Sequence, residues 1–116
     1  MRTLFVNLIL AVTLLSSCHE QLNLVEDVPR CVEKEINDRL AANSSKSVLA
    51  VYRIVAGGET YYYFVADCCD QINELYDTDC NYVCAPDGGI TGAGDGNCPG
   101  IFDDAASTLI WEKENQ

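Results

Sequence analysis

Apolar residues recur every four positions in one stretch of the chain, and this period predicts a helix. In "DVPRCVEKEINDRLAANSS", Val32, Ile36 and Leu40 fall on one helical face. Asp27 can cap the helix, Pro29 suits its first turn, and the polar "NSS" ends it. We therefore expect one amphipathic helix at the start of the folded domain.

The following stretch, "SVLAVYRIVAGGETYYYFVADCC", has the composition of a β-hairpin. It predicts strands over residues 48–55 and 60–67, joined by a turn in which Gly57 and Gly58 can adopt positive φ. The side chains of the second strand alternate between Tyr61, Tyr63 and Val65 on one face and Tyr62, Phe64 and Ala66 on the other. A tyrosine row of this kind is typical of cross-strand packing, and a ligand or partner platform is the alternative.

A second hairpin is expected in "NELYDTDCNYVCA", where Leu75 and Tyr76 face Tyr82 and Val83 across a polar turn. The last stretch, "IFDDAASTLIWEKENQ", fits either a helical turn that leads into a strand around residues 109–111 or one short helix, and we favour the strand. Together these elements predict an α+β fold, with one N-terminal helix packed on a small antiparallel sheet.

The N-terminus has the pattern of a secretory signal. Arg2 precedes "LFVNLILAVTLL", an apolar run shorter than the about 20 residues of a membrane span. The "LSSC" that ends at Cys18 resembles the lipobox of bacterial lipoproteins, which implies a signal peptide over residues 1–17 and lipidation of Cys18. A plain cleaved signal that leaves Cys18 unpaired is the alternative.

The expected organisation is then a lipidated cysteine and tether over residues 18–29, a single domain over residues 30–113, and a tail over residues 114–116. Removal of the signal leaves 99 residues with six basic and eighteen acidic side chains, and so a net charge of −12. This charge argues against binding to nucleic acid or to anionic headgroups, because both require basic side chains. The lipid on Cys18 is therefore the expected contact with a membrane.

The domain keeps an even number of cysteines, and a signal peptide would deliver them to an oxidising compartment. Three disulfides are therefore expected, with their pairing left open. The candidates are Cys31, Cys68, Cys69, Cys80, Cys84 and Cys98.

A glycine-rich loop lies between Cys84 and Cys98, in "CAPDGGITGAGDGNC". Its glycines do not have the dinucleotide-binding spacing, and it lacks the lysine of a phosphate-binding P-loop. A bond between these cysteines would close a fifteen-residue ring, whereas pairing of Cys84 with Cys68 or Cys69 would tie strand to strand. In either case we expect an exposed recognition loop over residues 85–97. Its candidate binding residues are Asp87, Gly88, Gly89, Gly94, Asp95 and Gly96.

Metal binding is a weaker alternative for the same loop. Asp87 and Asp95 could supply oxygens to a calcium ion, although two carboxylates are few for such a site. The nearby "DTDCN" lacks the spacing of an EF-hand, so it is interpreted as a hairpin turn in which Asp and Asn accept local backbone bonds. Zinc binding by Cys80, Cys84 and Cys98 is disfavoured because oxidation competes for the thiolates. We expect no cofactor, with calcium as the exception.

Catalytic residue types are scarce. The single histidine, His19, adjoins the predicted lipid anchor, which excludes Cys-His or Ser-His-Asp arrangements within the domain. Carboxylate hydrolysis, or redox chemistry at the adjacent Cys68 and Cys69, is left as the least favoured alternative. The sequence therefore predicts a binding module that is not an enzyme.

The motifs "YYYFVADCCDQINELYD", "CAPDGGITGAGDGNC" and "LIW" resemble a family of small uncharacterised lipoproteins of Bacteroidota-type bacteria that carry a domain of unknown function. The resemblance covers about residues 31–112 and implies a lipobox and an envelope location, but no activity. Related sequences often have an Asn-Gly-like turn where this chain has Asp79 and Cys80, which leaves the role of Cys80 open. The resemblance implies that surface export would require a dense acidic run after the lipidated cysteine. His19, Glu20 and Gln21 form no such run, so we expect an outer-membrane lipoprotein facing the periplasm, with the cell surface as the alternative. Its expected partner is a protein or a glycan.

Overall fold

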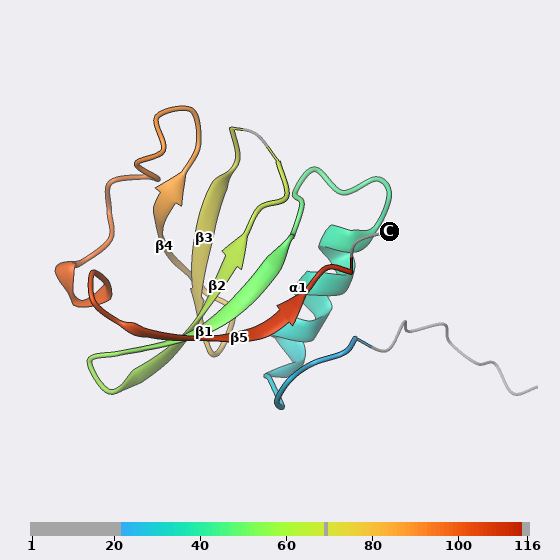
Figure 1. Cartoon of the computed structure of the whole chain (residues 1–116), viewed down its shortest axis with the longest axis horizontal. Helices are drawn as coiled ribbons and strands as arrows, with labels where there is room; N and C mark the ends of the chain where they lie inside the picture. Colours follow the sequence, from blue (N-terminus) through green and yellow to red (C-terminus); the bar gives the residue numbers. More distant parts are fainter. Residues whose placement is uncertain (1–21, 69, 115–116) are drawn as a thin grey trace, which may run out of the picture.

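The computed structural model describes residues 22–68 and 70–114, and it confirms the predicted α+β architecture (Figure 1). The elements are α1 (Arg30–Leu40), β1 (Ala50–Ala56), β2 (Glu59–Val65), β3 (Ile72–Asp77), β4 (Tyr82–Gly88), the 3-10 helix η1 (Gly100–Phe102) and β5 (Ala106–Glu112). The five strands form one antiparallel sheet in the order β4-β3-β2-β1-β5. In the described residues, no helix is both long and apolar enough to cross a bilayer.

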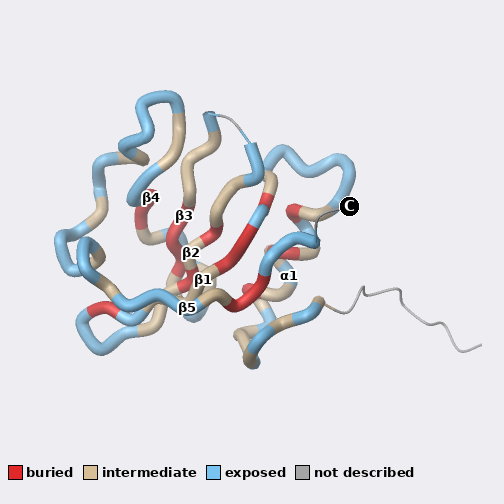
Figure 2. The backbone as a smooth tube through the Cα atoms, in the orientation of Figure 1, coloured by how far each residue is buried: buried red, intermediate tan, exposed pale blue. Residues whose placement is uncertain are grey.

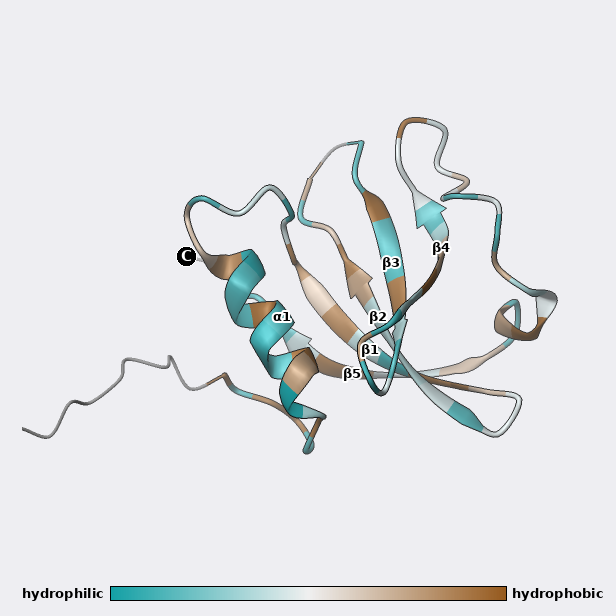
Figure 3. Ribbon diagram, turned by 180° about the vertical axis from the view of Figure 1, so that it is seen from behind, coloured by the Kyte–Doolittle hydropathy of each residue, from teal (hydrophilic) through white to brown (hydrophobic). Residues whose placement is uncertain are grey.

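Helix α1 uses the predicted apolar face. Val32 and Ile36 are fully buried, and Leu40 is partly buried against them. The prediction that Asp27 caps the helix is wrong, because Pro29 occupies the N-cap position in an extended conformation and no side chain caps the first turn. Figure 3 shows α1 as mostly hydrophilic, as expected for a helix that buries only one face.

Both predicted hairpins form, with strand ends shifted by one or two residues. Gly57 and Gly58 have φ of 58° and 77°, the conformation that a two-residue hairpin turn requires. In the second hairpin Tyr76 faces Tyr82 as predicted, but Leu75 faces Cys84 instead of the predicted Val83. An irregularity in the pairing of β3 and β4 causes this one-residue shift.

The two faces of the sheet differ in their cover. Helix α1 packs on one face, where the buried residues of Figure 2 form the core. That core consists of Val32, Ile36, Val48, Val51, Tyr62, Phe64, Tyr76, Ile110 and Trp111. The predicted alternation along β2 is confirmed, since Tyr62 and Phe64 lie in the core whereas Tyr63 lies on the opposite face.

The chain before α1 belongs to the packed domain from residue 22 onward. Leu22, Leu24 and Val28 pack against the core, and the Val25 amide donates to the Ile110 carbonyl at 2.9 Å. The last part of the predicted tether over residues 18–29 therefore covers part of the outer edge of β5. Cys18 and the predicted signal peptide lie outside the described residues.

Two disulfides join distant parts of the chain. One links Cys31 of α1 to Cys80 in the β3–β4 turn, and the other links Cys84 to Cys98. Cys68 is also disulfide-bonded, and Cys69 lies outside the described residues. The chain-entropy estimate gives about 4 kcal/mol for the first bridge and about 3 kcal/mol for the second. The disulfides indicate an extracytoplasmic location.

The bridge to Cys31 gives Cys80 a structural role in its turn. Cys80 has φ of 61°, in the left-handed region that favours glycine. Asp77 supports the same turn, because its Oδ1 accepts the amides of Asp79 and Asn81, each at 2.9 Å. This confirms the interpretation of "DTDCN" as a hairpin turn rather than an EF-hand loop.

A buried charge network connects α1 to the sheet. The Arg39 side chain is 3% exposed and donates to Glu35 at 2.9 Å, Glu74 at 3.0 Å and the Tyr76 hydroxyl at 3.0 Å. Its guanidinium carbon lies 4.6 Å from the centre of the Phe64 ring. This network fixes the C-terminal end of α1 against β3.

Candidate functional site

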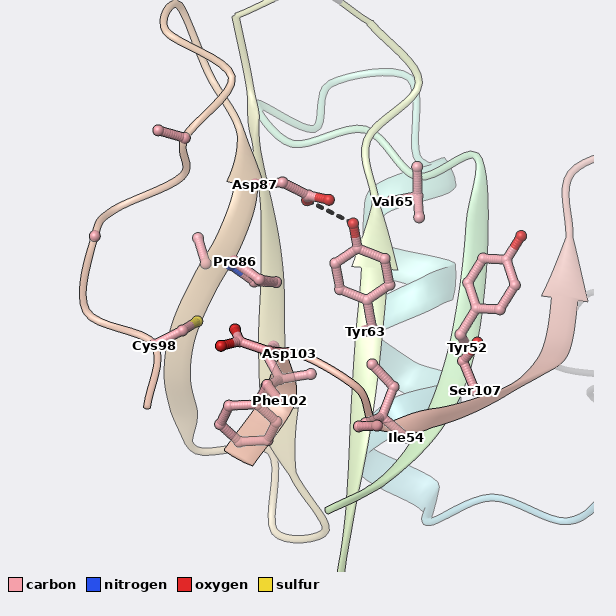
Figure 4. A pocket seen from close by; sticks show the side chains of 15 residues that line it. Tyr52, Ile54, Tyr63, Val65, Pro86, Asp87, Cys98, Phe102, Asp103 and Ser107 are labelled. Atoms are coloured by element: carbon pink, nitrogen blue, oxygen red, sulfur yellow. Dashed lines mark hydrogen bonds between the residues drawn. The ribbon is translucent and has the colours of Figure 1, made fainter. Parts of the chain in front are cut away.

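The sheet face opposite α1 carries a half-open groove of about 780 Å³ (Figure 4). Its floor is formed by side chains of β1 and β2, and one wall by β4 and the loop that follows it. The residues labelled in Figure 4 are Tyr52, Ile54, Tyr63, Val65, Pro86, Asp87, Cys98, Phe102, Asp103 and Ser107. The volume lies within the about 300–1,000 Å³ that is usual for ligand pockets.

The loop after β4 is held against the outer edge of that strand by backbone hydrogen bonds. The Asp95 amide donates to the Ala85 carbonyl, and the Gly94 amide donates to the Gly88 carbonyl, each at 3.0 Å. At Gly94, which has φ of 68°, an added Cβ would lie 2.0 Å from the Ala85 oxygen, so only glycine allows this approach. The disulfide between Cys84 and Cys98 fixes the far end of the same segment.

Within the groove, Tyr63 and Asp87 form a tight hydrogen bond that Figure 4 draws as a dashed line. The Tyr63 hydroxyl donates to Asp87 Oδ1 at 2.5 Å, and the Asn73 amide nitrogen donates to the same oxygen at 2.9 Å. Burial, together with the bond to Asp87, raises the pKa of Tyr63 well above its usual range. The tyrosine is thus a neutral donor that orients the carboxylate.

Asp95 has a tyrosine partner of its own. The Tyr82 hydroxyl donates to Asp95 Oδ2 at 2.5 Å, and the Asn97 amide donates to Oδ1 at 2.9 Å. Burial and the hydrogen bond to Asp95 raise the pKa of Tyr82 to about 12, while the same bond lowers the pKa of Asp95. The Tyr82 ring packs on Tyr76, which belongs to the core on the helix side. The pair of Tyr82 and Asp95 therefore fastens the loop at a point outside the groove lining.

The proposed calcium ligands therefore accept hydrogen bonds from different tyrosines. Asp87 bonds to Tyr63 of β2, and Asp95 bonds to Tyr82 of β4. In the described part of the chain, no three or more His, Cys, Asp or Glu residues are grouped so that they could hold a metal ion. Both carboxylates have structural hydrogen-bonding roles.

The predicted binding loop over residues 85–97 divides into parts with different roles. Its first residues belong to β4, which runs to Gly88. Asp87 and Gly96 line the groove, whereas Gly88 and Gly94 permit close backbone approaches. Gly89 continues the turn after β4, with its amide donating to the Gln71 carbonyl at 2.9 Å. The loop is thus a wall of the groove, and its glycines shape it.

The groove residues that sequence reasoning missed include Tyr52, Phe102 and Asp103. Alternation along the first predicted strand could have placed Tyr52 on the outer face together with Ile54. No local pattern marks Phe102 or Asp103, because they reach the groove only through the return of the chain from Cys98 toward β5.

Comparison with known proteins assigns the chain to a family. A family model described as a domain of unknown function, DUF6970, matches residues 37–113. No curated protein and no solved structure matches the chain. The matched region runs from the second half of α1 through β5 and includes all five strands and the groove. The chain therefore belongs to the DUF6970 family, whose function is not known.

Proposed function

We propose that this protein is a lipid-anchored binding module of the bacterial cell envelope, without catalytic activity, that holds a protein or glycan partner in the groove. The observation that carries the proposal is the half-open groove of about 780 Å³, with Tyr52 and Tyr63 on its floor. Their ring centroids are 6.2 Å apart, so they offer a continuous aromatic surface to a ligand. The wall is held by a disulfide and backbone bonds, so the site is pre-organised.

The absence of catalysis is proposed from the residue types at the site. Asp87 and Asp103 supply the carboxylates of the groove lining, and Asp87 already accepts bonds from Tyr63 and Asn73. The chain's single histidine, His19, adjoins the proposed anchor. Aromatic rings and hydrogen-bonding groups in a concave site suit recognition without further chemistry.

The binding function is tested with the full-length protein purified in detergent. We would screen it on glycan and peptide arrays and remeasure each hit with Tyr52→Ala, which removes a ring from the groove. Val55→Ala is the control, because Val55 is an exposed β1 residue outside the groove. A loss of binding in Tyr52→Ala alone supports the proposal. The proposal would be refuted if the folded protein bound no probe. It would also be refuted if Tyr52→Ala and Val55→Ala both bound every hit as tightly as the unchanged protein.

Anchoring is proposed to occur through lipid on Cys18, in the outer membrane facing the periplasm. The sequence support is the "LSSC" motif directly after the apolar run. Cys18→Ala should abolish incorporation of labelled palmitate and release the protein from the membrane fraction, while Ser17→Ala keeps a small residue before the cysteine and should retain both. Membrane retention of Cys18→Ala would contradict the anchor, and protease accessibility on intact cells separates the periplasmic from the surface location.

A further inference from the structure

Acidic and basic residues are unevenly distributed along the chain. Between Arg53 and Lys113 there are eleven acidic residues and no lysine or arginine, and this stretch supplies β2 to β5 and the groove wall. In the described part of the chain, the lysine and arginine ion pairs involve acids outside the groove. Among the described residues, no lysine or arginine forms an ion pair with Asp87 or Asp103.

These two carboxylates share the groove with aromatic side chains. Figure 4 shows Asp87 and Asp103 on the side of the groove that carries Pro86 and Cys98, with the Tyr52 ring on the opposite side. Both hydrogen bonds of Asp87 end on Oδ1, which leaves Oδ2 as an acceptor for a ligand. Carboxylates attract cations directly, and aromatic rings attract them through the negative charge of their faces.

We propose that the groove binds a basic peptide segment and that the lysine or arginine side chains of the peptide make the contacts. This inference rests on the proposed binding function. A neutral glycan could stack on Tyr52, but it would leave the carboxylates uncompensated, whereas a cationic side chain satisfies rings and carboxylates together. The segment binds through side chains rather than as an added strand, because residues 94 and 95 cover the edge of β4 and Val25 covers part of the edge of β5.

The decisive test compares two adjacent aspartates. Asp103 lines the groove, whereas Asp104 is exposed outside it, so Asp103→Asn and Asp104→Asn change the net charge equally and differ only at the site. Binding of a fluorescent peptide of alternating glycine and lysine or arginine would be measured with the full-length protein in detergent. Control peptides carry glutamine or glutamate at the basic positions, and a neutral oligosaccharide is measured alongside.

We expect the basic peptide to bind and the control peptides not to bind, with affinity falling as salt rises. Asp103→Asn should weaken binding about three- to tenfold and Asp104→Asn less than twofold. Equal effects of the two variants would show non-specific attraction to the acidic surface and overturn the inference, as would absence of peptide binding. If the oligosaccharide alone binds and depends on Tyr52, the inference fails while the proposed binding function stands.

Discussion

The buried charge network of Arg39 allows a sharp prediction about stability. Arg39→Ala removes a side chain that is 3% exposed and leaves Glu74, itself 11% exposed, with Lys46 as its remaining ion-pair partner. Removing one partner of a buried ion pair costs about 3–5 kcal/mol, because the other charge stays desolvated. That is a large part of the about 5–15 kcal/mol that stabilises a typical domain. We therefore expect Arg39→Ala to reduce the free energy of unfolding by about 4 kcal/mol.

The assay is urea unfolding of the oxidised full-length protein, followed by fluorescence of its single tryptophan, Trp111, which is 6% exposed in the core. With a slope of about 1.5 kcal/mol/M, the midpoint should fall by more than 2 M. The control is Lys34→Ala on the same helix, because its ion pair with Asp38 is exposed and its loss should leave the unfolding midpoint nearly unchanged.

A double variant tests the cause of the loss. Replacing both charges, as Arg39→Met with Glu74→Leu, also removes the carboxylate that has lost its buried partner, so the double variant should be at least about 1 kcal/mol more stable than Arg39→Met alone. A decrease in the free energy of unfolding of less than about 1 kcal/mol in Arg39→Ala would refute the reasoning. Full additivity of the two single changes in the double variant would refute it as well.

Three further predictions concern the loops around the sheet. Replacing both Cys84 and Cys98 by alanine should lower the free energy of unfolding by about 3 kcal/mol in urea titrations, and an unchanged midpoint would contradict the closed-loop account. The pKa of Asp77 is lowered, chiefly by backbone hydrogen bonding from Asn81, so its stabilisation is complete above about pH 4 and is lost as the pH falls through the depressed value. Asp77→Asn should therefore flatten the acid limb of stability measured from pH 2 to 6, and an identical limb would exclude this role. The pKa of Tyr82 is raised to about 12, so the contribution of its neutral hydroxyl to the stability of the fold is present below about pH 10 and is lost as the pH rises toward 12. Absorbance titration should show one late-ionising tyrosine fewer in Tyr82→Phe, and an unaltered titration would count against the bond to Asp95.

The sequence predicted the elements of the fold better than the site. The apolar spacing of Val32 and Ile36 located α1, and the Gly57-Gly58 turn located the first hairpin, because both signals depend on neighbouring residues only. The strand alternation correctly separated the core face, which carries Tyr62, from the groove face, which carries Tyr63. The predicted recognition loop also lies beside that face, although its first residues belong to β4.

By itself, the sequence determined the helix, the hairpins, the acidic character and the expectation of disulfides, since these follow from local periodicity, composition and cysteine number. Only the tertiary structure decided that Cys31 pairs with Cys80 and that Arg39 meets Glu74, contacts that span 49 and 35 positions. It also decided that Asp103 shares a groove with Tyr52. These contacts depend on the strand order β4-β3-β2-β1-β5, in which the last strand returns to the first. No local pattern encodes that return, because it is selected by the combined packing of the helix, the sheet and the covered edges.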